Sequence, residues 1–374
     1  MNIGITPNLK IVDWAIGRAG YNTDEFMLKF PVFAGWLQGD KLPTQKQLED
    51  FSQKVHLPFG YLFLEQPPQE KLAFPFFRTG NTTTFQVSLN LYDTILLMQK
   101  RQDWLVEYLK ENNAPQVPFV GKFAQINDPE IIVADIRKTL GLEPEWASLH
   151  KKNEEALDHL SSRVEEAGIF LSFNSVVENS NKRGIAVEEC RGFVLVNTYA
   201  PFLFVNAADS KAAQIFTIMH ELAHIWLGKS AGFDMQQLLP ADDPIEQLCD
   251  QVAAELLVPG VSFSRKWEEL KDIPKLAAYF KVSRIVIARR ALDHQKITKK
   301  EFFGWYNHYK VKLQEQKEKA SGGDFYLTQK KRLGLRFAGL VNQAVKETQL
   351  LYRDAYKLTG LKGDTYQHFM NNNF

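Results

Sequence analysis

Cysteine is scarce in this 374-residue chain, which contains only Cys190 and Cys249. Two cysteines so far apart in sequence exclude a disulfide framework and are typical of a protein that works in a reducing compartment. No apolar run approaches the roughly 20 residues that a membrane-spanning helix needs. Residues 1–14 also lack the basic and apolar regions of a secretory signal. These absences predict a soluble cytoplasmic protein with no membrane partner.

The chain also has almost no net charge, formally +1, but its charges are unevenly distributed. Residues 263–300 contain 11 Lys and Arg against 4 Asp and Glu, and residues 301–374 contain 12 against 7. The remaining 262 residues therefore carry −11. A basic C-terminal third on an acidic body could meet an anionic partner such as DNA. Alternatively, the lysines form only the solvated faces of surface helices.

Helical periodicity dominates the chain and predicts a fold that is mainly α with a small β-sheet (α+β). Helices are expected at 89–112, 131–140, 154–166, 213–227, 245–257, 301–320 and 330–358, and short strands at 169–173, 192–196 and 201–206. The third strand comes just before the helix over 213–227. Pro67 and Pro68 mark a linker after an N-terminal helical unit.

The helix expected over 213–227 contains the sequence His220-Glu221-Leu222-Ala223-His224. Residues four apart lie on one helical face, so both imidazoles can reach one metal ion. A carboxylate beside two such histidines can act as a general base on a water that the ion activates. This spacing is a zinc-hydrolase signature. It predicts His220 and His224 as Zn²⁺ ligands and Glu221 as the catalytic base.

A catalytic zinc ion takes a third protein ligand. Glu246 is the strongest candidate, and Asp250, four residues later on the same face, would accept the second ring N–H of a ligand histidine. This arrangement resembles that of thermolysin-like gluzincins. Asp250 or Glu255 as the ligand stays open. Cys249 is expected to point away from the face of Glu246 and Asp250 and to be a buried structural residue.

Residues 156–259 resemble the ImmA/IrrE family of metallo-endopeptidases. The likeness is carried by segments 188–193, 200–206 and 216–228, and by Glu246 with the segment 253–259. The resemblance implies a gluzincin-like zinc peptidase core flanked by helical domains, with His220, His224 and Glu246 as ligands and Glu221 as the base. Members of the family typically cleave a repressor or similar regulator. They often adjoin a helix-turn-helix domain, and some belong to toxin–antitoxin pairs.

The apolar segment 201–206 has two interpretations. In gluzincin-like folds an edge strand lies beside the active-site helix and can bind an extended peptide as an added strand. Phe202, Phe204 and Asn206 are therefore candidate substrate-binding residues. The alternative is that the segment is only a core strand.

Residues 8–64 resemble an Xre-type helix-turn-helix module. The turn at 36–39 and the segment 43–48 carry the likeness. However, residues 1–65 contain 6 Lys and Arg against 7 Asp and Glu, and the segment 31–37, where a recognition helix would lie, is almost wholly apolar. DNA binding needs phosphate and base contacts. Docking of a protein, or of the rest of this chain, is the favoured interpretation.

A second helix-turn-helix candidate lies at 274–290, within the basic segment. Arg284, Arg289 and Arg290 are its candidate nucleic-acid contacts. The alternative is a helical lid on the protease core, with arginines that make surface ion pairs.

The chain is thus predicted to have five segments: a helix-turn-helix-like domain at 1–68, a helical connecting region at 69–150, a zinc peptidase domain at 151–262, a helix-turn-helix-like extension at 263–300, and a basic helical C-terminal region at 301–374. The main hypothesis is a zinc-dependent, site-specific endopeptidase that acts in regulation. It would cleave or control a repressor or a toxin–antitoxin partner, with DNA as a further candidate partner. The alternative is a non-enzymatic DNA-binding regulator or antitoxin that keeps the zinc-peptidase fold as a scaffold.

Overall fold

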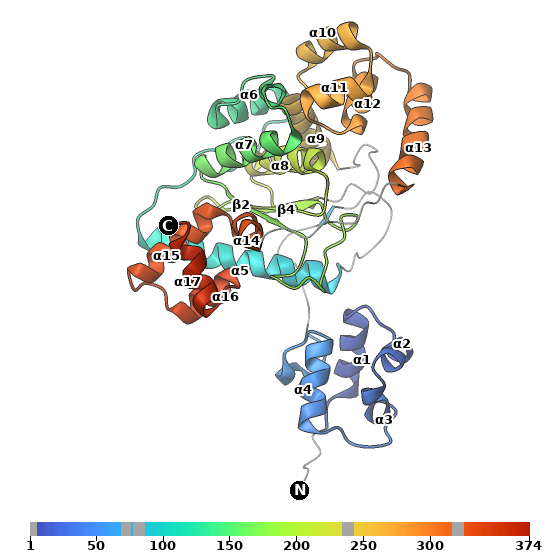
Figure 1. Ribbon diagram of the computed structural model, residues 1–374, viewed down its shortest axis with the longest axis vertical. Helices are drawn as coiled ribbons and strands as arrows, with labels where there is room; N and C mark the ends of the chain where they lie inside the picture. Colours follow the sequence, from blue (N-terminus) through green and yellow to red (C-terminus); the bar gives the residue numbers. More distant parts are fainter. Residues whose placement is uncertain (1–5, 69–75, 78–86, 234–242, 316–324) are drawn as a thin grey trace. The chain divides into compact units, whose positions relative to one another are not determined.

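The computed structural model describes residues 6–68, 76–77, 87–233, 243–315 and 325–374. The chain forms two compact units, one of Met1–Ala73 with Thr84–Asp93 and the other of Phe74–Thr83 with Thr94–Phe374. Most described residues are helical, and a small sheet lies in the second unit (Figure 1). The predicted fold class, mainly α with a small sheet, is therefore confirmed. The finer division into five segments stays a prediction.

The first unit is a small helical bundle with an aromatic core. It contains α1 (Leu9–Arg18), α2 (Thr23–Lys29), η1 (Pro31–Phe33), α3 (Ala34–Leu37), α4 (Gln45–Lys54) and η2 (Phe59–Phe63). Capping boxes begin α2 at Asn22 and α4 at Thr44. Phe33 and Trp36, from the predicted recognition segment, are buried with ring centroids 5.7 and 5.2 Å from that of Phe51. This segment therefore builds the core of the unit.

The sheet of the second unit has the strand order β1-β5-β3-β4-β2. The strands are β1 (Phe76–Phe77), β2 (Phe170–Asn174), β3 (Gly192–Leu195), β4 (Phe202–Asn206) and β5 (Ala231–Phe233). β3 runs antiparallel to β4 and β5, whereas the outer pairs β2–β4 and β1–β5 are parallel. The three predicted strands are present. β1 and β5 are too short to show an alternating pattern in the sequence.

β4 lies inside the sheet, paired with β3 on one side and β2 on the other. The prediction that it is an edge strand is therefore wrong, because its backbone groups are already paired and cannot add another strand. Phe202 and Phe204 stack on rings of the neighbouring strands with centroid distances of 5.2 and 4.8 Å. The side chain of Asn206 donates to the carbonyls of Ile185 and Cys190. These residues form the core of the sheet.

Helices cover both faces of the sheet (Figure 1). These are α5 (Leu89–Glu111), α6 (Pro129–Leu140), α7 (Asn153–Glu166), α8 (Lys211–Leu227) and α9 (Pro244–Leu257). α7 and α8 pack on one face, α9 packs along α8, and α6 packs on α9. On the other face Gln102 of α5 donates to the carbonyls of Leu195 and Ala200, both at 2.7 Å. α8 is thus packed between neighbouring elements, with β3 and β4 of the sheet and with α9 in contact with it.

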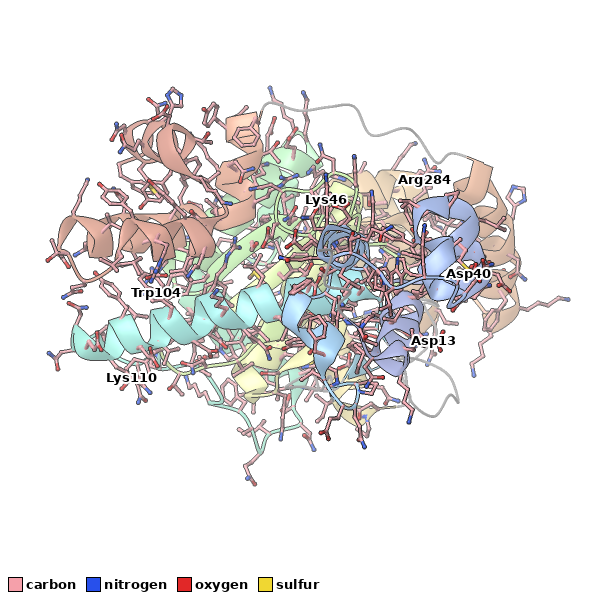
Figure 2. The ribbon with its side chains drawn as sticks, turned by 90° about the horizontal axis from the view of Figure 1, so that it is seen from below. Asp13, Asp40, Lys46, Trp104, Lys110 and Arg284 are labelled. Carbon is pink, nitrogen blue, oxygen red and sulfur yellow. The ribbon has the colours of Figure 1, made fainter. Side chains whose placement is uncertain are left out.

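The C-terminal part of the chain is wholly helical where it is described. It contains α10 (Gly260–Leu270), α11 (Ile273–Phe280), α12 (Arg284–Asp293), α13 (Lys299–Glu315), α14 (Phe325–Leu333), α15 (Leu335–Lys346), α16 (Tyr352–Thr359) and α17 (Gly363–Asn371). The prediction of one continuous helix over 330–358 is wrong. Gly334 and Thr348 adopt positive φ angles of 72° and 60° and interrupt the helix. Trp104, labelled on α5 in Figure 2, packs against Phe337 of α15 with ring centroids 5.9 Å apart. Within the described ranges, no helix has both the length and the apolar character that crossing a membrane would require.

Gly192 allows α8 to lie close to β3. A Cβ at this position would stand 2.8 Å from the carbonyl oxygen of Phe204 and in closer contact with the methyl group of Thr217 on α8. A glycine inside a strand is a signal in the sequence of such a close backbone approach.

We expect Gly192→Ala to lower the free energy of unfolding by roughly 1–3 kcal/mol, because the added methyl group overpacks the contact between helix and sheet. The shift in the thermal unfolding midpoint measures this. Gly184→Ala is the matched control, since a Cβ at Gly184 meets nothing within 4 Å. Equal shifts for the two variants would contradict the close-approach explanation.

Candidate metal centre

α8 carries the predicted metal-binding residues at its centre. The helix begins at the N-cap Ser210, whose side chain accepts from the N–H of Ala213, and ends at Gly228, which has a φ of 71°. Every residue from Gln214 to Leu227 is buried, because α7, α9 and the strands β3 and β4 all pack against the helix. Such an all-round buried helix places polar side chains in the interior only where they have a role.

Three side chains from α8 and α9 converge in this interior. His220 Nε2 lies 3.2 Å from His224 Nε2 and 3.1 Å from Glu246 Oε2, and Glu246 Oε1 lies 3.2 Å from His224 Nε2. In a tetrahedral zinc site with metal–ligand bonds of 2.0–2.1 Å, neighbouring ligand atoms stand about 3.3 Å apart. The observed separations are close to that spacing, so the three side chains are arranged as ligands of one ion would be.

Asp250 and Glu255, the two alternative third ligands, occupy different places. Asp250 Oδ1 lies 3.0 Å from His220 Nδ1, on the side of the ring away from Glu246. This contact fixes the ring orientation and leaves Nε2 to face the convergence point. Glu255 instead accepts from the N–H of Gly260 at 3.1 Å and pairs with Arg290 of α12. Glu255 is therefore turned away from the two histidines.

The carboxylates of Glu246 and Asp250 favour a positive charge between the side chains that converge here. Burial by itself would lower the pKa of His220, but hydrogen bonds to Asp250 and Glu246 and their negative charges raise it to about 10. Burial opposes ionisation of Glu246 too, yet hydrogen bonds from both histidines hold its pKa well below the ordinary value. Burial lowers the pKa of His224. An extra proton on His220 or a metal ion can supply the required charge.

Glu221 is fully buried beside this group, and neither carboxylate oxygen has a hydrogen-bond partner among the described residues. Burial raises the pKa of Glu221 to about 8. Glu221 Oε1 faces β3, 3.7 Å from the position that a Cβ on Gly192 would take. A buried carboxyl group without a partner is costly and needs a functional explanation. A nearby cation and a reacting water would provide one.

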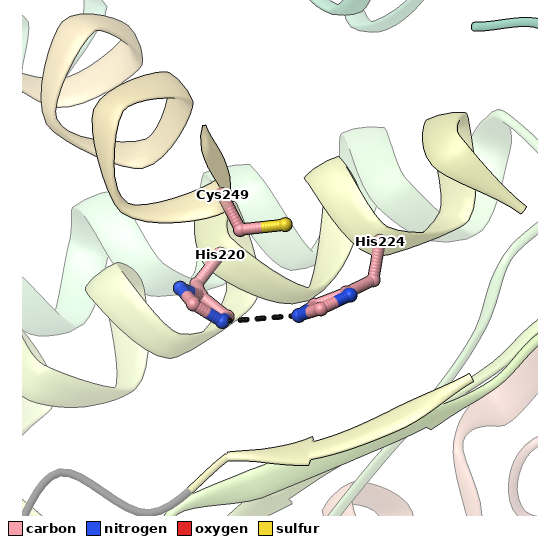
Figure 3. Close-up of side chains that lie close together, drawn as sticks. All are labelled: His220, His224 and Cys249. Carbon is pink, nitrogen blue, oxygen red and sulfur yellow. Dashed lines mark hydrogen bonds between the residues drawn. The ribbon is translucent and has the colours of Figure 1, made fainter. Parts of the chain in front are cut away.

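Cys249 is buried, as predicted, but its side chain does not point away from the candidate metal ligands. Its Sγ belongs to a buried group with ligand atoms of His220 and His224, all within 4.8 Å of one another (Figure 3). The reason is that residue i+3 lies beside residue i on a helix, so Cys249 shares the face of Glu246. Burial and the surrounding carboxylates raise the pKa of the thiol well above its ordinary value. The donor set around the histidines, with Glu246 or Cys249, is thus compatible with a metal ion.

The three candidate nucleic-acid contacts lie on α12 in different environments. Arg284 is exposed and is labelled in Figure 2. Arg289 Nε lies 3.0 Å from Asp293 Oδ1. Arg290 is buried, donates to the carbonyl of Val258 at 2.7 and 3.0 Å, and pairs with Glu255. The prediction that Arg290 contacts nucleic acid is therefore wrong, because its guanidinium joins α12 to the end of α9.

We expect Arg290→Ala to lower the free energy of unfolding by about 1–3 kcal/mol, because a charged hydrogen bond to Val258 is lost together with the ion pair to Glu255. Arg289→Ala is the matched control on the same helix, and its half-exposed ion pair predicts a loss below about 1 kcal/mol. Thermal unfolding of both variants checks this. An unchanged Arg290→Ala midpoint would show that the contact is not structural.

Comparison with known proteins gives two family matches. Residues 164–292 match peptidase family M78, described as the IrrE N-terminal-like domain, and residues 333–372 match a domain of unknown function (DUF8813). No curated protein and no solved structure gave a match. The helix-turn-helix interpretation of residues 8–64 stays a prediction. The first match spans α8 to α12, so the part of the chain that holds the candidate metal centre is similar to a metallopeptidase family.

Proposed function

We propose that this protein is a zinc-dependent endopeptidase that acts in regulation. The observation that carries the proposal is the convergence of His220 Nε2, His224 Nε2 and Glu246 within 3.1–3.2 Å. Beside them lies Glu221, which is buried and has no hydrogen-bond partner for its carboxylate in the described part of the chain. The match of residues 164–292 to peptidase family M78 supports it independently.

Zinc is the metal that the donor set suits best. Two imidazole nitrogens and one carboxylate are the protein ligands of a common class of catalytic zinc sites. Calcium and magnesium prefer sites built only from oxygen. When bound, Zn²⁺ supplies Lewis-acid activation of water and of a peptide carbonyl group.

The side chains around the ion would each have a defined task. Asp250 would accept a hydrogen bond from the N–H at His220 Nδ1 and so keep Nε2 available as a ligand. Glu221 would take a proton from the attacking water on one carboxylate oxygen and then deliver it to the nitrogen of the leaving amine. Its burial strengthens it as a base, because the carboxylate is not stabilised by water.

We infer that the partner is a protein, either a repressor or a member of a toxin–antitoxin pair. The resemblance to the ImmA/IrrE family supports this inference. Two of the three arginines proposed for DNA contact are already paired with carboxylates of this chain, so α12 offers little free positive charge for nucleic acid. The non-enzymatic alternative would leave the buried, unpartnered oxygens of Glu221 without a role.

The test is cleavage of a proteome-derived peptide library by the zinc-loaded full chain, followed by mass spectrometry of new termini. We expect a defined set of cuts that disappears when a zinc chelator is added and returns with Zn²⁺. Glu130→Gln is a control for the Glu221→Gln variant, since Glu130 is an exposed residue of α6. If the library stays intact with metal bound, or if chelation and Glu221→Gln leave the cuts unchanged, the peptidase proposal fails.

A further inference from the structure

A cavity of about 490 Å³ lies in the second unit, and none of the four candidate metal-site residues His220, Glu221, His224 and Glu246 lines it. Its walls come from α7, β2, the beginning of α8, and the region where α14 meets α15. Small-molecule sites in proteins typically have volumes of roughly 300–1,000 Å³. This cavity is therefore large enough for an organic ligand.

The lining combines an apolar surface with a cluster of charges. Side chains on α7, β2 and α15 provide the apolar part: Leu157, Leu171, Phe173 and Leu335. Four cationic side chains and only two carboxylates also line the cavity: Lys211, Lys330, Lys331 and Arg332 against Asp158 and Glu165. Positive charge therefore predominates beside an apolar wall, which is the lining that an amphipathic anion requires.

A bound anion would compensate the positive charges of Lys211 and Lys331 in particular. Burial, and secondly repulsion from Lys331, lower the pKa of Lys211. Lys211 has one weak contact from its ammonium group, to Gln214 Oε1 at 3.5 Å. Lys331 pairs with Asp158 at 3.1 Å, but these side chains are 44% and 57% exposed, so the pair is weak and can be displaced. An anion between the two lysines would remove their repulsion.

Glu165 gives a second, independent sign of a ligand. Its Oε1 is buried without a hydrogen-bond partner, next to Gly334, and both residues line the cavity. Burial raises the pKa of this carboxyl group. A hydroxyl or amide donor on a bound molecule would satisfy this oxygen, which the described part of the protein leaves unpaired.

We propose that this cavity binds a small organic anion with an apolar body. The anionic group lies between Lys211 and Lys331, and the apolar body packs on Leu171 and Phe173. Lys211 is the first residue of α8, the helix that carries the candidate metal ligands, and Lys331 lies just before the segment that matches the domain of unknown function. The bound anion therefore contacts α8 and α14 at once.

Anilinonaphthalene sulfonate is a suitable probe, because it joins an anionic group to an apolar body and becomes fluorescent when buried. We expect saturable binding to the full chain. Lys211→Met and Lys331→Met keep the aliphatic stem but remove the charge, and each should weaken binding about three- to tenfold. Lys346→Met on the exposed end of α15 is the matched control and should leave binding unchanged.

Phenylnaphthylamine, which has the same apolar body without the sulfonate group, separates charge from burial. Its affinity should not change in Lys211→Met or Lys331→Met. The proposal is overturned if the sulfonate probe does not bind, if Lys346→Met weakens it as much as the cavity variants do, or if the neutral probe responds equally to loss of the lysines. Thermal unfolding midpoints of the variants show that they remain folded.

Discussion

Glu221→Gln is expected to lower peptide cleavage about 10²- to 10⁴-fold while the protein still binds zinc. The substitution preserves the size of the side chain and removes its ability to accept a proton. Since Glu221 is not among the atoms that converge with Glu246, the ligands themselves are unchanged. Initial rates on a peptide identified from the library give the effect on catalysis, and a chromophoric chelator gives the zinc affinity.

The same substitution also tests the structure around Glu221. In the wild-type protein the carboxyl oxygens are buried without a hydrogen-bond partner among the described residues, and burial raises the pKa to about 8. A neutral amide removes the cost of a buried charge, so Glu221→Gln should not destabilise the metal-free protein. A protein that is at least as stable as wild type but inactive would separate catalysis from folding.

Two results would contradict this assignment. Cleavage at wild-type rates would remove Glu221 from the reaction, even if zinc remains necessary. Loss of zinc together with loss of activity would instead place Glu221 among the ligands. Glu130→Gln, on the surface of α6, should change neither the rate nor the zinc affinity.

The parts of the site that the sequence could predict are local. Helical spacing places His220 and His224 on one face, and the structure brings Glu246 and Asp250 to them because α9 is a regular helix packed along α8. Strands β2, β3 and β4 were predictable too, since each is a short apolar run before a turn. The spacing within each helix and the apolar runs of the strands depend on neighbours within a few residues along the chain, whereas the meeting of α8 and α9 is a contact between distant segments.

The parts that the sequence did not predict depend on contacts between distant segments. β4 is an inner strand only because β2, about 30 residues earlier, pairs with it in parallel. Arg290 is buried because it contacts Glu255 and Val258, which come before α10 in the sequence whereas Arg290 comes after it. Pro259 comes just after α9 and is also the N-cap of α10, because proline is tolerated at a helix start. No periodicity in the sequence contains such information.

The position of Cys249 beside the two histidines makes it a rival of Glu246 as the third protein ligand of the zinc ion. Loss of a group that only hydrogen-bonds a metal ligand weakens metal binding by about 10- to 100-fold. We expect Glu246→Ala to weaken zinc binding by more than this, because Glu246 would bind the ion itself. Asp250→Asn should lower the affinity by about 10- to 100-fold, because Asp250 contacts His220 at Nδ1 and not at the Nε2 atom that faces Glu246. Cys249→Ser should have little effect. Competition with a chromophoric chelator ranks the three variants.

This order follows from the distances around the histidines. The Glu246 oxygens lie 3.1 and 3.2 Å from the two Nε2 atoms, close to the spacing of ligands on one zinc ion. The Sγ atom of Cys249 and the ligand atoms of the two histidines lie within the wider limit of 4.8 Å of one another. Burial also keeps the Cys249 thiol protonated, and a thiol must lose its proton to bind metal. If Cys249→Ser loses zinc and Glu246→Ala keeps it, the sulfur is the third ligand. A thiolate-to-metal charge-transfer band in the cobalt-substituted protein would then appear, and our assignment predicts its absence.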